Sequence, residues 1–394
     1  GFRLAHRETV THGDRERQRH TQCRPSRSSR LGLHARSRRL GVALHISTRQ
    51  ALSPSLPPPT PPHPPAPPPP PPHPSLLPPS PPPHPTPAAA RVAPADVFPP
   101  GGQEPAFQLL DVRAPVEVQQ STIPSALSLP ILNDEERAAV GTCYHEQGNT
   151  AAVALGVKLT APFREERVAG WREAVAASER PSVFACWRGG QRRRIATEWL
   201  DDPNVSRVQG GTKALRQHLM AGLETQASKT EILVVSGRTG SGKTDLLHAL
   251  RRAAPAGVLA LDLEGLANHR GSAFGGFPAG QPAQQTFENA VAATVQLAAP
   301  RLALVEDEAR FVGRVEVPHC IFSRTQQSPV IVLETPLSER IDRIVREYVF
   351  EPTNKTSRAV VRQELEANIL KLKKRLGGAR LAECLKGLAA ADHE

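Results

Sequence analysis

The chain has 394 residues, which is long enough for two domains with tails, and its formal net charge is +11. Residues 1–100 hold 13 arginines, no lysine and 4 acidic residues, whereas residues 101–394 hold 36 basic and 34 acidic ones, so the overall charge is no argument that the folded part binds nucleic acid. The 5 cysteines are widely spaced without a C-x-x-C pair, and no run of about 18 apolar residues occurs; this argues against a disulfide framework, a structural zinc site or a membrane span, and suits a reducing compartment.

Residues 1–100 form a leader that is rich first in Arg and Ser and then in Pro. Residues 51–100 contain 25 of the 41 prolines, and no hydrophobic period survives in either half. Proline runs favour extended chain that cannot build a core, so we expect this leader to be disordered. An organelle transit peptide, a proline-motif ligand or a translated upstream region are the alternatives.

Residues 101–222 read as a first domain in which strands alternate with helices. The apolar runs at 107–112, 182–185 and 205–208 predict strands, and helical patterns cover 134–140, 150–159 and 164–177. Such alternation predicts a mostly parallel sheet. Asp111 and Arg113 stand at the end of the first strand, where sites collect in α/β sheets.

One short loop in this domain carries the strongest chemical signal. It follows the strand at 182–185 and precedes a helix with Ile195 and Trp199 on one face. Its glycines let backbone N–H groups turn inward, and the next helix points its N-terminus at the cysteine. A cysteine so placed is expected to ionise more readily than a free thiol, although a buried apolar role is the plain alternative. The candidate catalytic residues are Cys186, Arg188, Gly189, Gly190 and Arg192.

Residues 229–355 read as a second domain built on a phosphate-binding loop. The apolar strand at 232–236 leads into a full G-x-x-x-x-G-K-[ST] match, and a helix follows at 245–253. The glycines allow N–H groups to wrap a phosphate, while the lysine adds charge and the threonine can ligate Mg²⁺. The candidate phosphate-binding residues are Gly237, Arg238, Thr239, Gly240, Ser241, Gly242, Lys243 and Thr244.

Acidic clusters follow two later strands of this domain, at 262–264 and 306–308, and the second is typical of a Walker B strand. The segment 262–275 is dense in glycine and polar residues and could cradle a substrate; solvated surface charge is the alternative for the acids. The candidate acid or substrate-loop residues are Asp262, Glu264, His269, Arg270 and Asp307. Residues 356–394 are predicted as a helical tail with a basic run at 371–375, either a solvated face or a contact to phosphate backbone.

Several of these motifs resemble a known family. The segments 111–117 and 123–126, with the cysteine loop, are similar to a rhodanese domain, whose cysteine carries a sulfane sulfur. The segments 140–142, 186–190 and 210–216 resemble the rhodanese half of tRNA 2-selenouridine synthases, and 262–275 matches that family nearly verbatim. The resemblance covers residues from about 108 to 380. Arg193 stands where the family has serine, and Ala309 replaces a family serine after the acids.

The resemblance implies a fold and an activity. The fold is α/β: a rhodanese-like parallel-sheet domain, then a P-loop NTPase-like α/β domain and the helical tail. The implied activity converts 2-thiouridine at the tRNA wobble position to 2-selenouridine through S-geranyl-2-thiouridine. Geranyl diphosphate and selenophosphate are the implied co-substrates, Mg²⁺ is a further candidate, and Cys186 is the implied nucleophile or selenium carrier.

Two other functions fit the residues. One is a sulfurtransferase with an accessory P-loop domain, and the other is a P-loop kinase or ATPase with a non-catalytic rhodanese module. The leading expectation is a cytoplasmic enzyme with tRNA as its partner; an organellar location would follow if residues 1–50 were a transit peptide.

Overall fold

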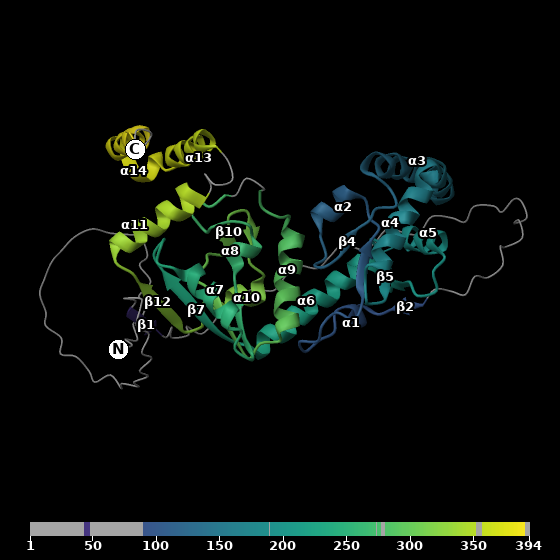
Figure 1. Ribbon diagram of the computed structural model, residues 1–394, viewed down its shortest axis with the longest axis horizontal. Helices are drawn as coiled ribbons and strands as arrows, with labels where there is room; N and C mark the ends of the chain where they lie inside the picture. Colours follow the sequence, from purple (N-terminus) through teal and green to yellow (C-terminus); the bar gives the residue numbers. More distant parts are fainter. Residues whose placement is uncertain are drawn as a thin grey trace, which may run out of the picture.

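The computed structural model describes the backbone of residues 43–47 and the residues 90–188, 190–272, 274–276, 280–351 and 357–390. Two mainly parallel sheets lie side by side, and helices α6 (Gly211–Lys229) and α9 (Gln284–Ala298) stand between them (Figure 1). We call the sheet of residues 91–208 with its helices the first lobe and the sheet formed mainly by residues 231–334 with its helices the second lobe.

The first lobe holds a parallel sheet in the order β2-β6-β5-β3-β4. The strands are β2 (Arg91–Val92), β3 (Gln108–Asp111), β4 (Leu127–Ser128), β5 (Ser182–Ala185) and β6 (Ser206–Val208). All four residues of β5 are buried, as expected of a central strand covered on both faces. The helices of this lobe are α1 (Pro94–Val97), α2 (Pro115–Gln120), α3 (Asp134–Thr160), α4 (Arg164–Ala176) and α5 (Gln191–Leu200), with a 3-10 turn at Ala161–Phe163.

The second lobe holds a sheet in the order β1-β12-β7-β9-β8, parallel except for its edge strand β1. The strands are β1 (Ala43–Ser47), β7 (Glu231–Gly237), β8 (Val258–Leu261), β9 (Leu302–Glu306) and β12 (Val330–Glu334), beside a small hairpin of β10 (Phe311–Val312) and β11 (Val315–Glu316). The helices are α7 (Lys243–Ala253), α8 (Leu263–Leu266), α10 (His319–Thr325) and α11 (Leu337–Val345), which continues into the π-helical turn η2 (Arg346–Phe350).

One hydrophobic core runs through both lobes. Buried residues of β3 and β5 belong to the same cluster as those of β7 and β9, joined by Leu219 of α6 and Val291 of α9. Polar contacts also join the two lobes where they meet. Asn289 Nδ2 donates to the Thr122 carbonyl at 2.8 Å, and Arg216 Nη1 donates to Asn289 Oδ1 at 2.8 Å. The shared core and these polar contacts therefore fix the carboxyl edges of the two sheets relative to each other.

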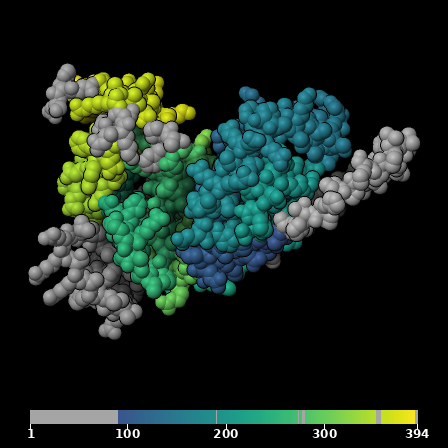
Figure 2. Space-filling view, turned by 45° about the vertical axis from the view of Figure 1, so that its right-hand side comes forward, coloured from purple at the N-terminus to yellow at the C-terminus, as the bar shows by residue number. Residues whose placement is uncertain are grey.

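The C-terminal residues form α13 (Arg358–Lys371) and α14 (Lys373–Ala390), which turns at Gly377, where φ is +74°. In Figure 2 these yellow helices lie over the second lobe and away from the blue first lobe. The helical tail predicted for 356–394 is thus present as two helices. None of the described helices combines the length and the hydropathy that a membrane-spanning helix needs.

The predicted leader needs a correction at its end. Val92, Val97 and Phe98 are buried, and β2 pairs with β6, so residues 91–98 belong to the first lobe although we expected disorder up to residue 100. Composition misled because the proline-rich region runs directly into this segment. Residues 43–47 also form a strand, paired antiparallel with β12. Residues 1–42 and 48–89 lie outside the described residues.

Candidate active site

The Cys186 thiol lies directly after β5, at the carboxyl edge of the first sheet. The residue is buried in a cluster with Trp171 and Phe184, yet its sulfur faces the Arg193 guanidinium, with Nη1 3.9 Å from Sγ. A thiol in purely apolar surroundings would have no such charged neighbour. The arrangement therefore fits a nucleophile better than a packing residue.

The first turn of α6 holds the loop backbone in place. Thr212 N donates to the Cys186 carbonyl at 2.8 Å, and Lys213 N donates to the Trp187 carbonyl at 3.1 Å. Gly211 permits this approach, because its φ is +69° and a Cβ there would stand 2.1 Å from the Cys186 carbonyl oxygen. The Gly210-Gly211 pair thus has a structural role beneath the cysteine loop.

The predicted loop residues divide by their positions. Gly190 caps α5 with φ +84°, Arg188 is exposed, and Gly189 lies outside the described residues. Arg192 forms an ion pair with Glu117 of α2, in which Nη2 lies 3.0 Å from Oε1. Burial lowers the pKa of Arg192, but the Glu117 pair outweighs it and the pKa is raised. Arg192 is thus held as a fixed cation beside the cysteine loop.

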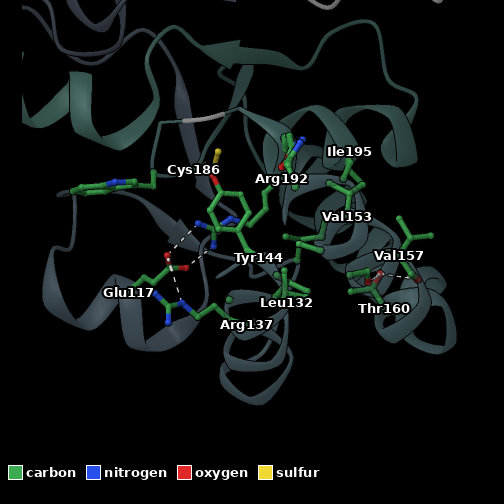
Figure 3. Close-up of a pocket in the computed structure, with 18 of the residues that line it drawn as sticks. Glu117, Leu132, Arg137, Tyr144, Val153, Val157, Thr160, Cys186, Arg192 and Ile195 are labelled. Atoms are coloured by element: carbon green, nitrogen blue, oxygen red, sulfur yellow. Dashed lines mark hydrogen bonds and ion pairs between the residues drawn. The ribbon is translucent and has the colours of Figure 1, made fainter. Parts of the chain in front are cut away.

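A cavity of about 670 Å³ opens beside this thiol. Figure 3 shows Glu117 between Arg192 and Arg137 at one end, and Val153, Val157 and Ile195 at the other. Burial raises the pKa of Glu117, but the ion pair with Arg192 prevails and the pKa lies below its ordinary value. Glu117 therefore stays ionised, and its carboxylate is paired with the two neighbouring arginines.

The loop that we expect to bind phosphate joins β7 to α7, which is the strand–loop–helix order that the sequence predicts. Gly240 and Gly242 have φ of +76° and +89°, which glycine adopts readily. Lys243 Nζ donates to the Gly237 carbonyl at 3.3 Å, and Thr244 Oγ1 donates to Glu306 Oε1 at 3.1 Å. Arg343 of α11 covers the loop and donates to the Gly240 carbonyl at 2.7 Å. The loop thus has the backbone geometry for a phosphate, with cations on two sides.

A second cavity, of about 570 Å³, joins this loop to the predicted substrate segment. His269 and Arg270 line it, and the Arg270 guanidinium lies 4.9 Å from the centre of the Tyr348 ring. Burial lowers the pKa of His269. Among the predicted acids, Asp262 caps α8 through Gly265 N at 2.6 Å, and Asp307 accepts from Ser236 Oγ at 2.6 Å.

Three glutamates gather beside Thr244. Burial, and after it the charges of Glu264 and Asp262, raises the pKa of Glu306 to about 8. Burial together with Glu308 raises the pKa of Glu264 to about 8, and burial also raises the pKa of Glu308. Like charges crowded in a poorly solvated place hold protons, unless a cation neutralises them.

This donor set is compatible with Mg²⁺ in one way. No group of three metal-ligating side chains with suitable geometry occurs within the described parts of the chain. A phosphate-bound Mg²⁺ needs few protein ligands, and the Thr244 hydroxyl with Glu306 behind it supplies that minimum. The Thr244 hydroxyl and Glu306 therefore fit an ion that is held mainly by a bound phosphate.

Sequence reasoning missed four side chains at the two sites: Arg193, Glu117, Glu306 and Arg343. In the sequence, Arg193 stands out only as a departure from the family, and Glu306 only as part of an acidic run. Alternation along β9 does not single out Glu306, because this residue lies on the opposite face of the strand from the buried Ala303 and Val305. Nothing local could have paired Glu117 with Arg192, since 75 positions separate them.

The fold and sites define an α/β protein with a cysteine at the edge of one parallel sheet and a phosphate-binding loop at the edge of another. The family model described as the tRNA 2-selenouridine synthase AAA domain matches residues 230–394. The tRNA 2-selenouridine synthase of Bdellovibrio bacteriovorus is 40% identical over 72% of this chain and 80% of that protein. Those of Shewanella denitrificans and Chromohalobacter salexigens are 39% and 38% identical, over 72% and 73% of this chain and 79% and 80% of theirs. The chain belongs to the tRNA 2-selenouridine synthase family, which consists of tRNA-modifying transferases.

Proposed function

We propose that the chain converts 2-thiouridine at the tRNA wobble position to 2-selenouridine through an S-geranylated intermediate. One observation carries the proposal: a thiol beside a guanidinium and a phosphate-binding loop lie at the edges of two sheets that share one core. The first lobe would act as a rhodanese-like module and the second as a P-loop module. Membership of the family supports tRNA and selenophosphate as substrates.

The second lobe would carry out the alkylation. The thiouridine sulfur attacks the first carbon of geranyl diphosphate, the carbon–oxygen bond breaks, diphosphate leaves and the ring N3 proton goes to solvent. Residues Gly237–Thr244 would hold the diphosphate, and Lys243 and Arg343 would stabilise the charge on the leaving group. Mg²⁺ would add to that stabilisation when bound at Thr244.

The first lobe would exchange sulfur for selenium. Alkylation turns a poor leaving group into a thiolate, so the Cys186 thiolate can attack C2 and expel geranyl thiolate. Selenium of selenophosphate then attacks C2, Cys186 leaves as its thiolate, and water cleaves the selenium–phosphorus bond to give phosphate and the 2-seleno group. Arg193 and the Arg192–Glu117 pair would favour the anionic sulfur.

The test uses two variants and mass spectrometry of nucleosides from thiolated tRNA. With both co-substrates, Cys186→Ala should accumulate S-geranyl-2-thiouridine without 2-selenouridine, whereas Lys243→Ala should form neither. Lys243→Ala given already geranylated tRNA should still form 2-selenouridine. Normal selenation by Cys186→Ala would refute the role of the thiol. ATP hydrolysis that is lost in Lys243→Ala, with no geranylation in the unmodified protein, would indicate a P-loop ATPase instead.

A further inference from the structure

The cavity beside Cys186 has a polar end and an apolar end. Figure 3 places Cys186, Glu117 and Arg137 toward one end and Val153, Val157 and Ile195 toward the other. Leu132, Ala152 and Trp199 add to the lining. Its volume of about 670 Å³ lies within the range of small-molecule sites, which is about 300–1,000 Å³.

Four of the polar groups that line this cavity, those of Glu117, Arg137, Arg192 and Thr160, already have partners within the protein. Arg192 and Arg137 both face Glu117, the latter at 3.9 Å. Thr160 Oγ1 donates to the Gly156 carbonyl of its own helix at 2.7 Å. A ligand that enters the apolar end therefore meets aliphatic and aromatic surface, which suits a hydrocarbon group better than a phosphate or a sugar.

Exposed apolar side chains surround the same opening. Tyr144 is 54% exposed, Val157 47% and Trp187 41%, and all three line the cavity. Apolar surface gathered around a concave site commonly marks a binding site rather than chance exposure. The motif at 140–142, on which the family resemblance partly rests, also lines this cavity through Val140, Gly141 and Thr142.

We infer that this cavity of the first lobe binds the branched aliphatic chain carried on the sulfur of the substrate uridine. The inference rests on the proposed function. If Cys186 attacks C2, the group on the departing sulfur must lie within a few bonds of the Cys186 sulfur. The apolar end offers a place for that chain, and the Arg192–Glu117 pair lies at the end where the reaction occurs. The aliphatic chain would thus contribute to substrate binding and also depart as part of the leaving group.

The experiment compares two anticodon stem-loop RNAs, one carrying S-geranyl-2-thiouridine and one carrying S-methyl-2-thiouridine. Dissociation constants are measured with the full chain and without selenophosphate. Since a single methylene in an apolar pocket changes discrimination by about 10–200-fold, the S-geranyl RNA should bind at least about 100-fold tighter than the S-methyl RNA. If the protein binds both RNAs equally, the inference is overturned.

Two substitutions test where the aliphatic chain of the substrate binds, and a third is the matched control. Val153→Phe fills the cavity and should reduce the preference to less than about tenfold, while Val157→Asp places a charge at the exposed rim and should reduce it in the same direction. Ala154→Phe adds the same ring on the exposed side of α3 and should leave the preference unchanged.

If Val153→Phe does not fold, Val157→Asp decides, because its site is already half exposed. If both variants keep the preference of the unmodified protein, the aliphatic chain binds elsewhere, such as in the P-loop cavity, and the inference is overturned. Cys186→Ser separates this result from the proposed function: it should keep the binding preference and form no 2-selenouridine. If it did form 2-selenouridine, the role of Cys186 would fail whatever the binding result.

Discussion

The Arg193 guanidinium lies 3.9 Å from the Cys186 sulfur, whereas its neighbour Arg192 turns to Glu117. Two consecutive arginines of α5 thus point to different partners, one to the thiol and one to the carboxylate of α2. In the proposed mechanism, contact with the reacting sulfur of Cys186 therefore falls first to Arg193, and Arg192 acts as part of a fixed pair at the rim.

Arg193→Ala should make Cys186 less reactive. Loss of the cation should slow alkylation of the thiol by iodoacetamide at neutral pH by about two- to fivefold, which corresponds to the energy of a partly exposed charge contact of about 0.4–1 kcal/mol. Mass spectrometry of the Cys186 peptide measures the rate. Arg194→Ala is the control, because Arg194 pairs with Glu198 on the exposed face of the same helix. An equal effect of both substitutions would contradict a specific role for Arg193.

Glu117→Gln should destabilise the first lobe and disturb the cysteine loop. The substitution leaves Arg192 and Arg137 without the carboxylate they face, and we expect a loss of about 1–3 kcal/mol in the free energy of unfolding. Urea unfolding followed by tryptophan fluorescence measures it. Glu198→Gln removes an exposed i,i+4 pair and should cost less than about 0.5 kcal/mol. Similar losses in the two variants would show that the half-buried position of Glu117 adds nothing.

Glu306 should make the protein less stable as pH rises. Its pKa is raised from 4.5 to about 8 in the folded chain, so between these values the folded state holds a proton that the unfolded state has lost. Stability from this group is therefore greatest below pH 4.5 and falls as the pH approaches 8. Glu306→Gln removes the pH dependence that comes from this group. When the pH rises from 5 to 8, the free energy of unfolding of the variant should therefore increase by about 1–3 kcal/mol relative to that of the unmodified protein.

Thermal midpoints at the two pH values provide the measurement for Glu306. Glu231→Gln, at the exposed start of β7, is the matched control and should follow the unmodified protein. Added diphosphate with Mg²⁺ should raise the midpoint of the unmodified protein more at pH 8 than at pH 5, because a cation near Thr244 favours the charged carboxylates. A midpoint for Glu306→Gln that changes with pH as in the unmodified protein would disprove the burial argument.

Local motifs were predictable from the sequence, and long-range partners were not. The loop at Gly237–Thr244 follows from backbone geometry encoded in eight consecutive residues, and the strand before Cys186 follows from an apolar run. The partners of Arg192 and Asn289 depend on how helices approach one another, and an amphipathic pattern predicts a buried face without naming what covers it. The shared core of α6 and α9 could not be predicted for the same reason.

Gly211→Ala should displace the cysteine loop from α6. The residue has φ of +69°, and a Cβ there would stand 2.1 Å from the Cys186 carbonyl oxygen and 2.8 Å from that of Trp187. The loop must move or the hydrogen bond from Thr212 N to Cys186 O must lengthen, so we expect a loss of at least about 1–3 kcal/mol in stability together with slower selenation. Gly170→Ala in α4 is the matched control, since a Cβ there meets nothing within 4 Å and alanine favours a helix by about 0.5–1 kcal/mol. The two substitutions should therefore shift the unfolding midpoint in opposite directions, and a neutral Gly211→Ala would show that α6 does not hold the cysteine loop.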